Sequence, residues 1–259
     1  MTQLAITDHD TVAGYRAVVG HYTQVCEEMT LIAGVEMSCR WSGATIHILG
    51  LGIDCDHPVM KAGLKILNQA RIDRGEEISR RLAALGFEGA LVGAMDKAGS
   101  SQLGRPHFAQ WMIEQGHVAN FNQAFDKYLG RGKTGDVKSC WPELAEVTRW
   151  IAASGGIAAI AHPLYYKFTR MKLRRMVVDF IEAGGRAIEL INGRQTADQT
   201  AQLRRLASEF ELEVTAGSDF HRDSEYGAKL GVDPVLLKGM PAVWERWSGP
   251  GFAAEESVG

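Results

Sequence analysis

Cysteine is scarce in this chain, and its few cysteines lack the spacings that build a zinc ribbon or a disulfide framework. The 259 residues include four cysteines, Cys26, Cys39, Cys55 and Cys140, and no two of them form a C-x-x-C pair. Scattered cysteines in a chain of this length are typical of free thiols in a reducing compartment. We therefore expect a cytoplasmic protein without structural disulfides.

Long hydrophobic runs and a strong excess of one charge are also missing. No apolar stretch approaches the roughly 20 residues that a membrane-spanning helix needs, and the N-terminus lacks the basic and apolar regions of a signal peptide. The 28 basic and 31 acidic residues leave a formal net charge of −3. We expect a soluble protein with no membrane contact and no broad adhesion to nucleic acid, although a local basic groove is compatible with this charge.

Short apolar strands alternate with helical stretches along most of the chain. The predicted strands cover residues 4–7, 31–35, 45–51, 156–161, 187–191 and 212–216. The predicted helices cover residues 11–29, 57–85, 142–153, 172–183 and 198–210. This order is typical of an α/β fold with a mostly parallel sheet and helices outside it. Residues 87–139 break the rhythm with two short helices (108–115 and 121–129) between glycine-rich turns, which predicts an inserted helical subdomain.

Histidines and carboxylates follow several of the predicted strands or lie inside them. They are His9, Glu36, His47, His162, Asp219 and His221. Each has an ordinary explanation alone, since a histidine inside a strand, such as His47, is more often a hydrogen-bonded core residue than a ligand. Asp219 and His221 are stronger, because residues at i and i+2 of an extended segment project to the same side. Since chemistry in barrels of this type sits at the C-terminal strand ends, the whole set predicts one metal site.

The types of donor atom indicate which ions this site would hold. Imidazole nitrogens with carboxylate oxygens, and no thiolate, suit Mn²⁺, Zn²⁺ or Fe²⁺ better than a cysteine-based structural zinc. Glu36 has two carboxylate oxygens and can bridge a pair of ions. Neighbouring ions are typical of phosphate-ester hydrolysis, in which one ion activates water and others neutralise the phosphoryl oxygens. The sequence therefore predicts a metal-dependent phosphoesterase.

The ordered motifs of the chain resemble those of the PHP (polymerase and histidinol phosphatase) family. They are Thr7-Asp8-His9-Asp10-Thr11, Gly34-Val35-Glu36, His47-Ile48-Leu49-Gly50, Ala161-His162-Pro163 and Gly217-Ser218-Asp219-Phe220-His221. Together these motifs extend over almost the whole chain. Two segments of the insertion, residues 104–107 and 129–133, resemble the branch that contains 3′,5′-nucleoside bisphosphate phosphatases and 5′-to-3′ exoribonucleases.

The resemblance implies a distorted (β/α)7 barrel with an inserted helical subdomain. On this expectation the barrel comprises residues 1–56 and 140–249, the helical segment with the inserted subdomain comprises residues 57–139, and residues 250–259 form a frayed tail. The resemblance also implies a centre of two or three divalent ions, often manganese.

The resemblance assigns roles to individual residues as well. The metal ligands would be His9, Glu36, His47, His162, Asp219 and His221. Of these, His9, Asp219 and His221 would also take part in catalysis. Arg105 and His107 would reach substrate phosphate from the insertion, a task that suits the fork of a guanidinium group. Lys133 and Tyr165 are further candidates for a phosphate contact.

Two departures from the family pattern bear on activity. The family normally opens with a strand bearing His-x-His and a Ser-Asp-Gly loop, whereas here Met1 falls close to the Thr-Asp-His motif. The barrel is therefore expected to be N-terminally truncated and to lack a pair of histidines and an aspartate. We interpret this as a start codon placed downstream of the true start of an active enzyme, the alternative being a genuine short form with an incomplete site. In the second departure, Tyr165 stands where related sequences usually carry arginine.

Rival functions are excluded or stay as alternatives. The sequence argues against a serine hydrolase built on Ser218, His221 and Asp219, because Ser218 lacks a G-x-S-x-G elbow. A P-loop is excluded because Lys127 stands where its first glycine would be. Histidinol-phosphate phosphatase is the alternative within the hydrolases. A catalytically impaired regulator that binds nucleotides or RNA is the alternative from another class.

The expected substrate is a small phosphate ester, a nucleotide, or else the 5′ end of an RNA. An acidic protein that processes RNA needs a local basic track. Its candidates are Lys127, Arg131, Lys133 and Lys138 in the insertion, and Lys167, Arg170, Lys172, Arg174 and Arg175 beyond His162. A solvated helix face is the alternative explanation of the second group.

Overall fold

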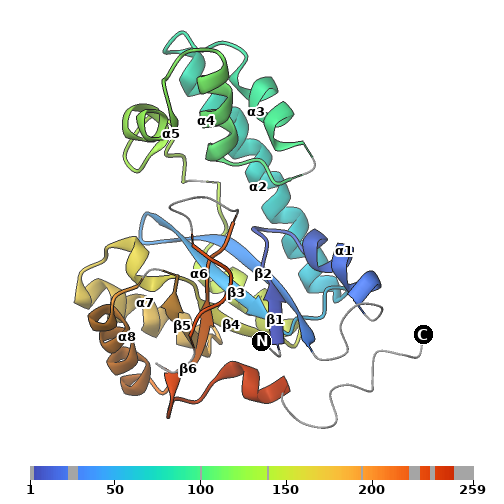
Figure 1. The fold of residues 1–259 in the computed structure, drawn as a ribbon, viewed down its shortest axis with the longest axis vertical. Coiled ribbons are helices and arrows are strands. Elements are labelled where there is room, and N and C mark those ends of the chain that lie inside the picture. The colour runs from blue at the N-terminus through green and yellow to red at the C-terminus, as the bar shows by residue number, and fades with distance from the viewer. Residues whose placement is uncertain are drawn as a thin grey trace.

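The computed structural model describes residues 3–22, 29–99, 101–138, 140–193, 195–221, 228–233 and 237–247. These residues form a curled six-stranded sheet with helices against it, and a helical subdomain that stands at one end (Figure 1). Cys26 and the expected tail at 250–259 lie outside the described residues. Within the described ranges, no helix is both long and apolar enough to cross a membrane.

The sheet is mostly parallel, as predicted, and one strand among those described is antiparallel to the others. Its strands are β1 (Gln3–Ile6), β2 (Thr30–Trp41), β3 (Ala44–Leu51), β4 (Ile157–Ile160), β5 (Ala187–Asn192) and β6 (Glu213–Gly217). They lie side by side in sequence order, and β3 is antiparallel to both of its neighbours. The reason is the turn at Ser42 and Gly43, whose φ angles of 47° and 73° suit a two-residue hairpin. The chain therefore returns beside β2 without a crossover helix.

Helices cover the sheet and build the subdomain. They are α1 (Ala13–Tyr22), α2 (Pro58–Ala83), α3 (Ala90–Ala98), α4 (Arg105–Glu114), α5 (Phe121–Ala124), α6 (Leu144–Ala153), α7 (Arg170–Glu182) and α8 (Ala197–Glu209), with helical turns η1 (Phe125–Leu129), η2 (Pro163–Tyr166) and η4 (Val243–Trp247). Side chains of α6, α7 and α8, including Ile151, Phe180 and Leu203, pack into one buried cluster with the strands. This confirms the predicted α/β layers.

Helix α3 was not predicted. It lacks a side-chain cap at its start, where Gly89 takes a φ of 79°. Its Val92 and Met95 are exposed, so the helix has no clean apolar stripe. Gly93 lies inside it because the Trp111 ring occupies the space that a Cβ would need. Because of its glycines and exposed apolar residues, the sequence of this helix lacks the periodic pattern from which helices are predicted.

Helix α2 belongs to two hydrophobic cores. It starts at Pro58, after His57 has accepted a hydrogen bond from the Val59 amide at 3.3 Å. In its first half, Leu67 packs with the strands, whereas Leu82 near its end packs with the helices of the insertion. The same continuous helix thus carries the insertion away from the barrel (Figure 1).

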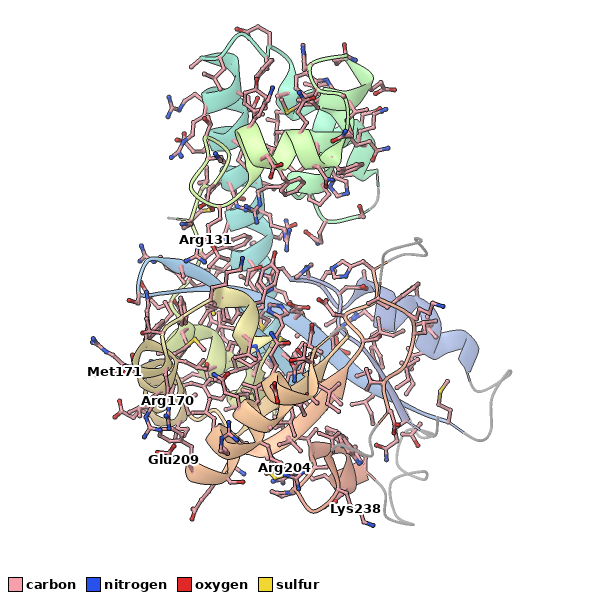
Figure 2. All side chains as sticks on the ribbon, turned by 60° about the vertical axis from the view of Figure 1, so that its left-hand side comes forward. Arg131, Arg170, Met171, Arg204, Glu209 and Lys238 are labelled. Carbon is pink, nitrogen blue, oxygen red and sulfur yellow. The ribbon has the colours of Figure 1, made fainter. Side chains whose placement is uncertain are left out.

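A second connection joins the insertion to the barrel. Figure 2 places Arg131 at the junction between the two parts. Its Nη1 donates a hydrogen bond to the carbonyl oxygen of Tyr166 in η2 at 3.0 Å. Because η2 directly follows His162, the insertion contacts the barrel at the rim where the candidate ligands lie.

Candidate metal centre

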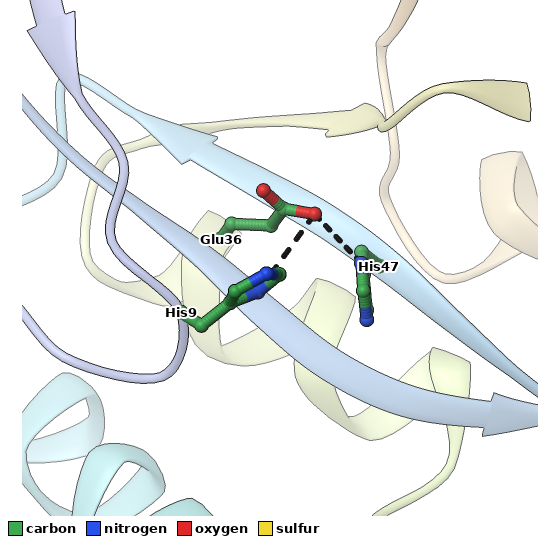
Figure 3. A group of neighbouring side chains, drawn as sticks. All are labelled: His9, Glu36 and His47. Carbon is green, nitrogen blue, oxygen red and sulfur yellow. Dashed lines mark ion pairs between the residues drawn. The ribbon is translucent and has the colours of Figure 1, made fainter. Parts of the chain in front are cut away.

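The carboxylate of Glu36 is surrounded by three imidazole rings. Its Oε1 atom lies 2.7 Å from Nδ1 of His47, 3.0 Å from Nε2 of His162 and 3.9 Å from Nδ1 of His9. Ligand atoms of His9, Glu36 and His47 all fall within 4.8 Å of one another (Figure 3). Four of the six expected ligands therefore meet at one carboxylate oxygen.

The chain after β1 places His9 beside Glu36. Beyond Ile6 it continues along β2, where His9 and Glu36 form a parallel bridge. The Glu36 amide donates to the Asp8 carbonyl at 3.1 Å, and the Asp10 amide donates to the Glu36 carbonyl at 2.9 Å. Backbone hydrogen bonds on both sides of His9 thus fix its position relative to the carboxylate.

The hairpin of β2 and β3 places His47 on the same face of the sheet as Glu36. Glu36 pairs with Leu49, and Ser38 pairs with His47. Because side chains two residues apart on a strand share a face, Glu36, Ser38 and His47 point to one side. The predicted end of the second strand before Glu36 was wrong, since β2 runs on to Trp41. Glu36 is therefore a residue of the strand interior.

Glu189 holds His162 in place and was missed by the sequence analysis. The His162 backbone has φ 30° and ψ 56°, and its amide donates to Oε2 of Glu189 at 2.6 Å. Asn192 donates to the same oxygen at 3.0 Å. The His162 Nε2 atom also lies 3.2 Å from Nδ1 of His47. An acidic residue inside an otherwise apolar buried strand was the signal that could have identified Glu189.

Asp219 and His221 lie on the segment after β6. The His221 ring is 5.8 Å from the His9 ring between centroids, and its Nδ1 lies 3.5 Å from Oδ1 of Asp219. The expected extended conformation is wrong here, because Asp219 has a φ of 52°. A left-handed turn, and not a shared strand face, brings the two side chains together.

The cluster moves the pKa values of its members in different directions. Burial lowers the pKa of His9 to about 4. Burial opposes ionisation of Glu36, but the His47 charge and hydrogen bonds from His162 and His47 outweigh it and hold the pKa of Glu36 well below its usual range. Burial raises the pKa of Glu189 to about 7. Near neutral pH, Glu36 is ionised and His9 is neutral, which are the protonation states that metal ligands need.

Two imidazole nitrogens of the cluster lack a hydrogen-bond partner in the part of the chain that the structure describes. Within the described residues, Nδ1 of His9 and Nδ1 of His162 are buried and make no hydrogen bond. Burying such an atom without a partner costs free energy, so these nitrogens are suited to bind an added ligand. Since neutral imidazole nitrogens and an ionised carboxylate bind divalent transition metals, the residues present fit such an ion.

The chain is similar to characterised bacterial enzymes over nearly its full length. It is 40% identical to a 5′-3′ exoribonuclease of Haemophilus influenzae, over 94% of this chain and 88% of that protein. It is 35% identical to a 3′,5′-nucleoside bisphosphate phosphatase of Chromobacterium violaceum, over 94% and 85% of the two chains. The chain belongs to the PHP phosphoesterase family. Its resemblance to the nucleotide branch of that family is thereby confirmed. No protein-family model matches the sequence.

Solved structures agree with the PHP fold. An amidohydrolase from Chromobacterium violaceum, solved with bound sulfate and no metal, has a TM-score of 0.83 at 33% identity and covers 95% of this chain and 85% of its own. A structure from Bifidobacterium adolescentis has a TM-score of 0.74 at 22% identity and covers 93% and 85%. The expected distorted α/β barrel is confirmed, and PHP enzymes are hydrolases that act on phosphate ester bonds.

On the insertion side of the PHP barrel, Asp10 has a role that the sequence did not indicate. Thr11 caps α1 by accepting from the Ala13 amide at 3.2 Å. Asp10 is instead buried, where its Oδ1 accepts from the Ser38 amide at 2.6 Å and its Oδ2 from Nε of Arg71 at 2.8 Å. This carboxylate therefore links the segment next to His9 to helix α2.

The expected phosphate-binding residues lie at two places. The Arg105 guanidinium donates to the Leu129 carbonyl at 3.0 Å, and His107 Nδ1 accepts from the Gly104 amide at 3.0 Å. Lys133 is exposed in the insertion. Among the described contacts, none joins these three side chains to the Glu36 carboxylate. Tyr165 is 77% exposed, and its ring lies 5.5 Å from that of His162.

Proposed function

We propose that this protein is a divalent-metal-dependent phosphoesterase that hydrolyses phosphate esters of nucleotides at the Glu36 centre. The observation that carries the proposal is the single buried carboxylate oxygen shared by three histidines, two of which have a buried nitrogen without a hydrogen-bond partner among the described residues. The names of the relatives favour a nucleotide or the 5′ end of an RNA as substrate over histidinol phosphate.

The proposed ligands are the residues that surround this oxygen and the pair after β6. They are His9, Glu36, His47, His162, Asp219 and His221. A bound divalent ion, for which we propose Mn²⁺, supplies a Lewis acid and an activated water. The Asp219 and His221 side chains are 35% and 61% exposed, so they stand on the side that substrate can approach. For that reason we assign a catalytic role to these two residues and to His9.

The remaining residues orient the ligands. Glu189 fixes His162 through its amide, and Tyr166 donates its hydroxyl hydrogen to the Ala161 carbonyl at 2.9 Å while accepting from the His47 amide at 2.9 Å. Groups of this kind keep ligands in place and so preserve affinity for an ion. Both Tyr166 and Glu189 are buried, which keeps water away from the back of the site.

Substrate phosphate would be bound from the insertion and from η2. Arg71 supports this placement, because it binds Asp10 beside His9 and also donates from Nη1 to the Leu103 carbonyl at 3.0 Å. Burial, and after it the positive charge of Arg71, lowers the pKa of His107. The segment that carries Arg105 and His107 is therefore tied to the end of the site occupied by His9. Lys133 and the Tyr165 hydroxyl are the other groups that we assign to phosphate.

Metal content and turnover of matched variants test the proposal. The wild-type protein should retain divalent metal in elemental analysis and release phosphate from adenosine 3′,5′-bisphosphate with added Mn²⁺. Glu36→Gln should lose both properties, whereas Glu146→Gln, an exposed change on α6, should keep both. A wild-type protein that binds nucleotide without metal or turnover would be the regulator and not the enzyme. Faster turnover of histidinol phosphate would select the other hydrolase.

A further inference from the structure

A positively charged surface begins beside His162. We define the basic strip as Arg131, Lys167, Arg170 and Arg175, all of which are exposed. Arg131 lies next to Lys167 although the two are far apart in sequence. Its guanidinium donates to the carbonyl of Tyr166, the residue before Lys167. Arg170 then begins helix α7, and Arg175 follows in its second turn. Figure 2 shows Arg131 and Arg170 along the same flank of the molecule.

The basic strip carries few compensating carboxylates within the described residues, where Arg170 acts on the Glu209 carboxylate without pairing with it. Residues 163–175 include five basic and no acidic side chains, although the whole chain has a net charge of −3. Two of these five basic side chains already have partners and are not counted in the strip. Lys172 donates to the Ser42 carbonyl at 3.3 Å, and Arg174 pairs with Glu209. Within the described residues, no member of the basic strip forms an ion pair with a carboxylate. A concentration of unpaired cations on an acidic protein is a local site for a polyanion.

Flat and apolar groups accompany these cations. Tyr165 is 77% exposed at the end nearest His162, and Met171 is 81% exposed between Arg170 and Lys172. Single-stranded nucleic acid binds to surfaces that combine cations for its phosphates with exposed side chains on which its bases lie. A protein or membrane partner would require a larger apolar patch than these two separated side chains provide.

We propose that the basic strip binds the body of a single-stranded RNA whose 5′ end occupies the Glu36 centre. This rests on the proposed function, because it takes the phosphoesterase site as the place of the scissile phosphate. The strip would contact nucleotides downstream of that phosphate and would contribute nothing to a mononucleotide. It therefore predicts that affinity rises with the length of the RNA.

The test compares two double variants with the same change in charge. Arg170→Gln/Arg175→Gln neutralises the basic strip. Lys65→Gln/Lys238→Gln removes two cations that are exposed and have no ion pair within the described residues, on α2 and near the C-terminal end of the described chain. For a 5′-phosphorylated oligonucleotide of about ten residues, the strip variant should raise KM about tenfold, whereas the control should match the wild type. Turnover of adenosine 3′,5′-bisphosphate should stay unchanged in both variants.

Binding separates failure of this inference from failure of the proposed function. In fluorescence anisotropy with a single-stranded oligonucleotide, the strip variant should reduce the slope of log Kd against log salt concentration by about 1.4. That measurement needs no turnover, so it decides the matter even if the wild type hydrolyses neither substrate. Equal KM and equal salt dependence in the two variants would overturn the proposal, as would a strip variant that loses mononucleotide turnover.

Discussion

Arg71 and Asp10 form a buried ion pair that joins the candidate metal centre to the helical insertion. Their side chains are 8% and 0% exposed, and Nη2 of Arg71 lies 2.5 Å from Oδ2 of Asp10. The Ser38 hydroxyl donates to the same oxygen at 2.9 Å, and the guanidinium lies over the Trp141 ring at 5.5 Å. Every polar atom of the carboxylate is therefore satisfied by groups from β2 and α2.

Breaking this pair from one side should destabilise the protein. Arg71→Met leaves the Asp10 carboxylate buried without its cation, so we expect the free energy of unfolding to fall by about 3–5 kcal/mol. The double variant Asp10→Asn/Arg71→Met removes both charges and should recover part of that loss. Urea denaturation of the two single variants and the double variant measures the coupling. Additive losses would contradict a direct ion pair.

Tyr166→Phe should lower the stability of the protein and its retention of metal. The change removes a hydroxyl that serves the His47 amide and the Ala161 carbonyl, and both backbone groups then lie buried without this partner. We expect a loss of about 1–3 kcal/mol in unfolding free energy and weaker retention of metal. Tyr165→Phe removes an exposed hydroxyl and is the matched control for stability. Equal stability of the two variants would argue against this role of Tyr166.

Glu189 should make the metal-free protein less stable as pH rises. Burial raises its pKa from 4.5 in the unfolded chain to about 7 in the folded protein. The folded state thus keeps a proton that the unfolded state releases, so this stability is present below pH 4.5 and is lost as pH rises through 7. The full effect is about 3 kcal/mol. Glu189→Gln stays neutral and should lack this fall, so urea denaturation at increasing pH should show a gap between the two stabilities that widens up to about pH 7. Curves that stay parallel would contradict it.

Arg105→Ala should weaken the binding of substrate more than the binding of metal. The guanidinium contacts the insertion and not the Glu36 carboxylate, so the content of metal should stay unchanged. Loss of one charge-assisted contact to phosphate should raise KM for adenosine 3′,5′-bisphosphate by about 10- to 100-fold with a smaller effect on kcat. Because the Leu129 hydrogen bond is lost too, thermal unfolding should be measured alongside. Loss of metal from this variant would place Arg105 at the ions.

His162 and Asp219 were predictable because each follows a short apolar strand. His162 follows β4 by two residues, and Asp219 likewise follows β6 by two residues. Since strands of one sheet end at a common rim, their order along the chain was enough to bring them together. Glu36 was expected just after the end of its strand, whereas it lies inside β2. Polar residues such as Ser38 and Arg40 made the strand look shorter in the sequence than it is.

The supporting residues could not be predicted because their partners are distant in sequence. Arg71 lies on a highly charged helix and resembles a solvated residue until α2 is packed against Asp10. Glu189 acquires its role only through the amide of His162, 27 residues earlier. Patterns of hydrophobicity describe which face of an element is buried, but they carry no information about which buried polar groups pair across elements.

Helix α2 also limits how the protein can change during evolution. Leu67 and Ile78 belong to different cores of the molecule and are joined by uninterrupted helix. Inserting or deleting one residue between them would turn the helical insertion by about 100° around the helix axis and move it by about 1.5 Å. A change between Leu67 and Arg71 would also point Arg71 away from Asp10. The length of this helix, and not only its sequence, is consequently under constraint, whereas the surface turns of the insertion can change length freely.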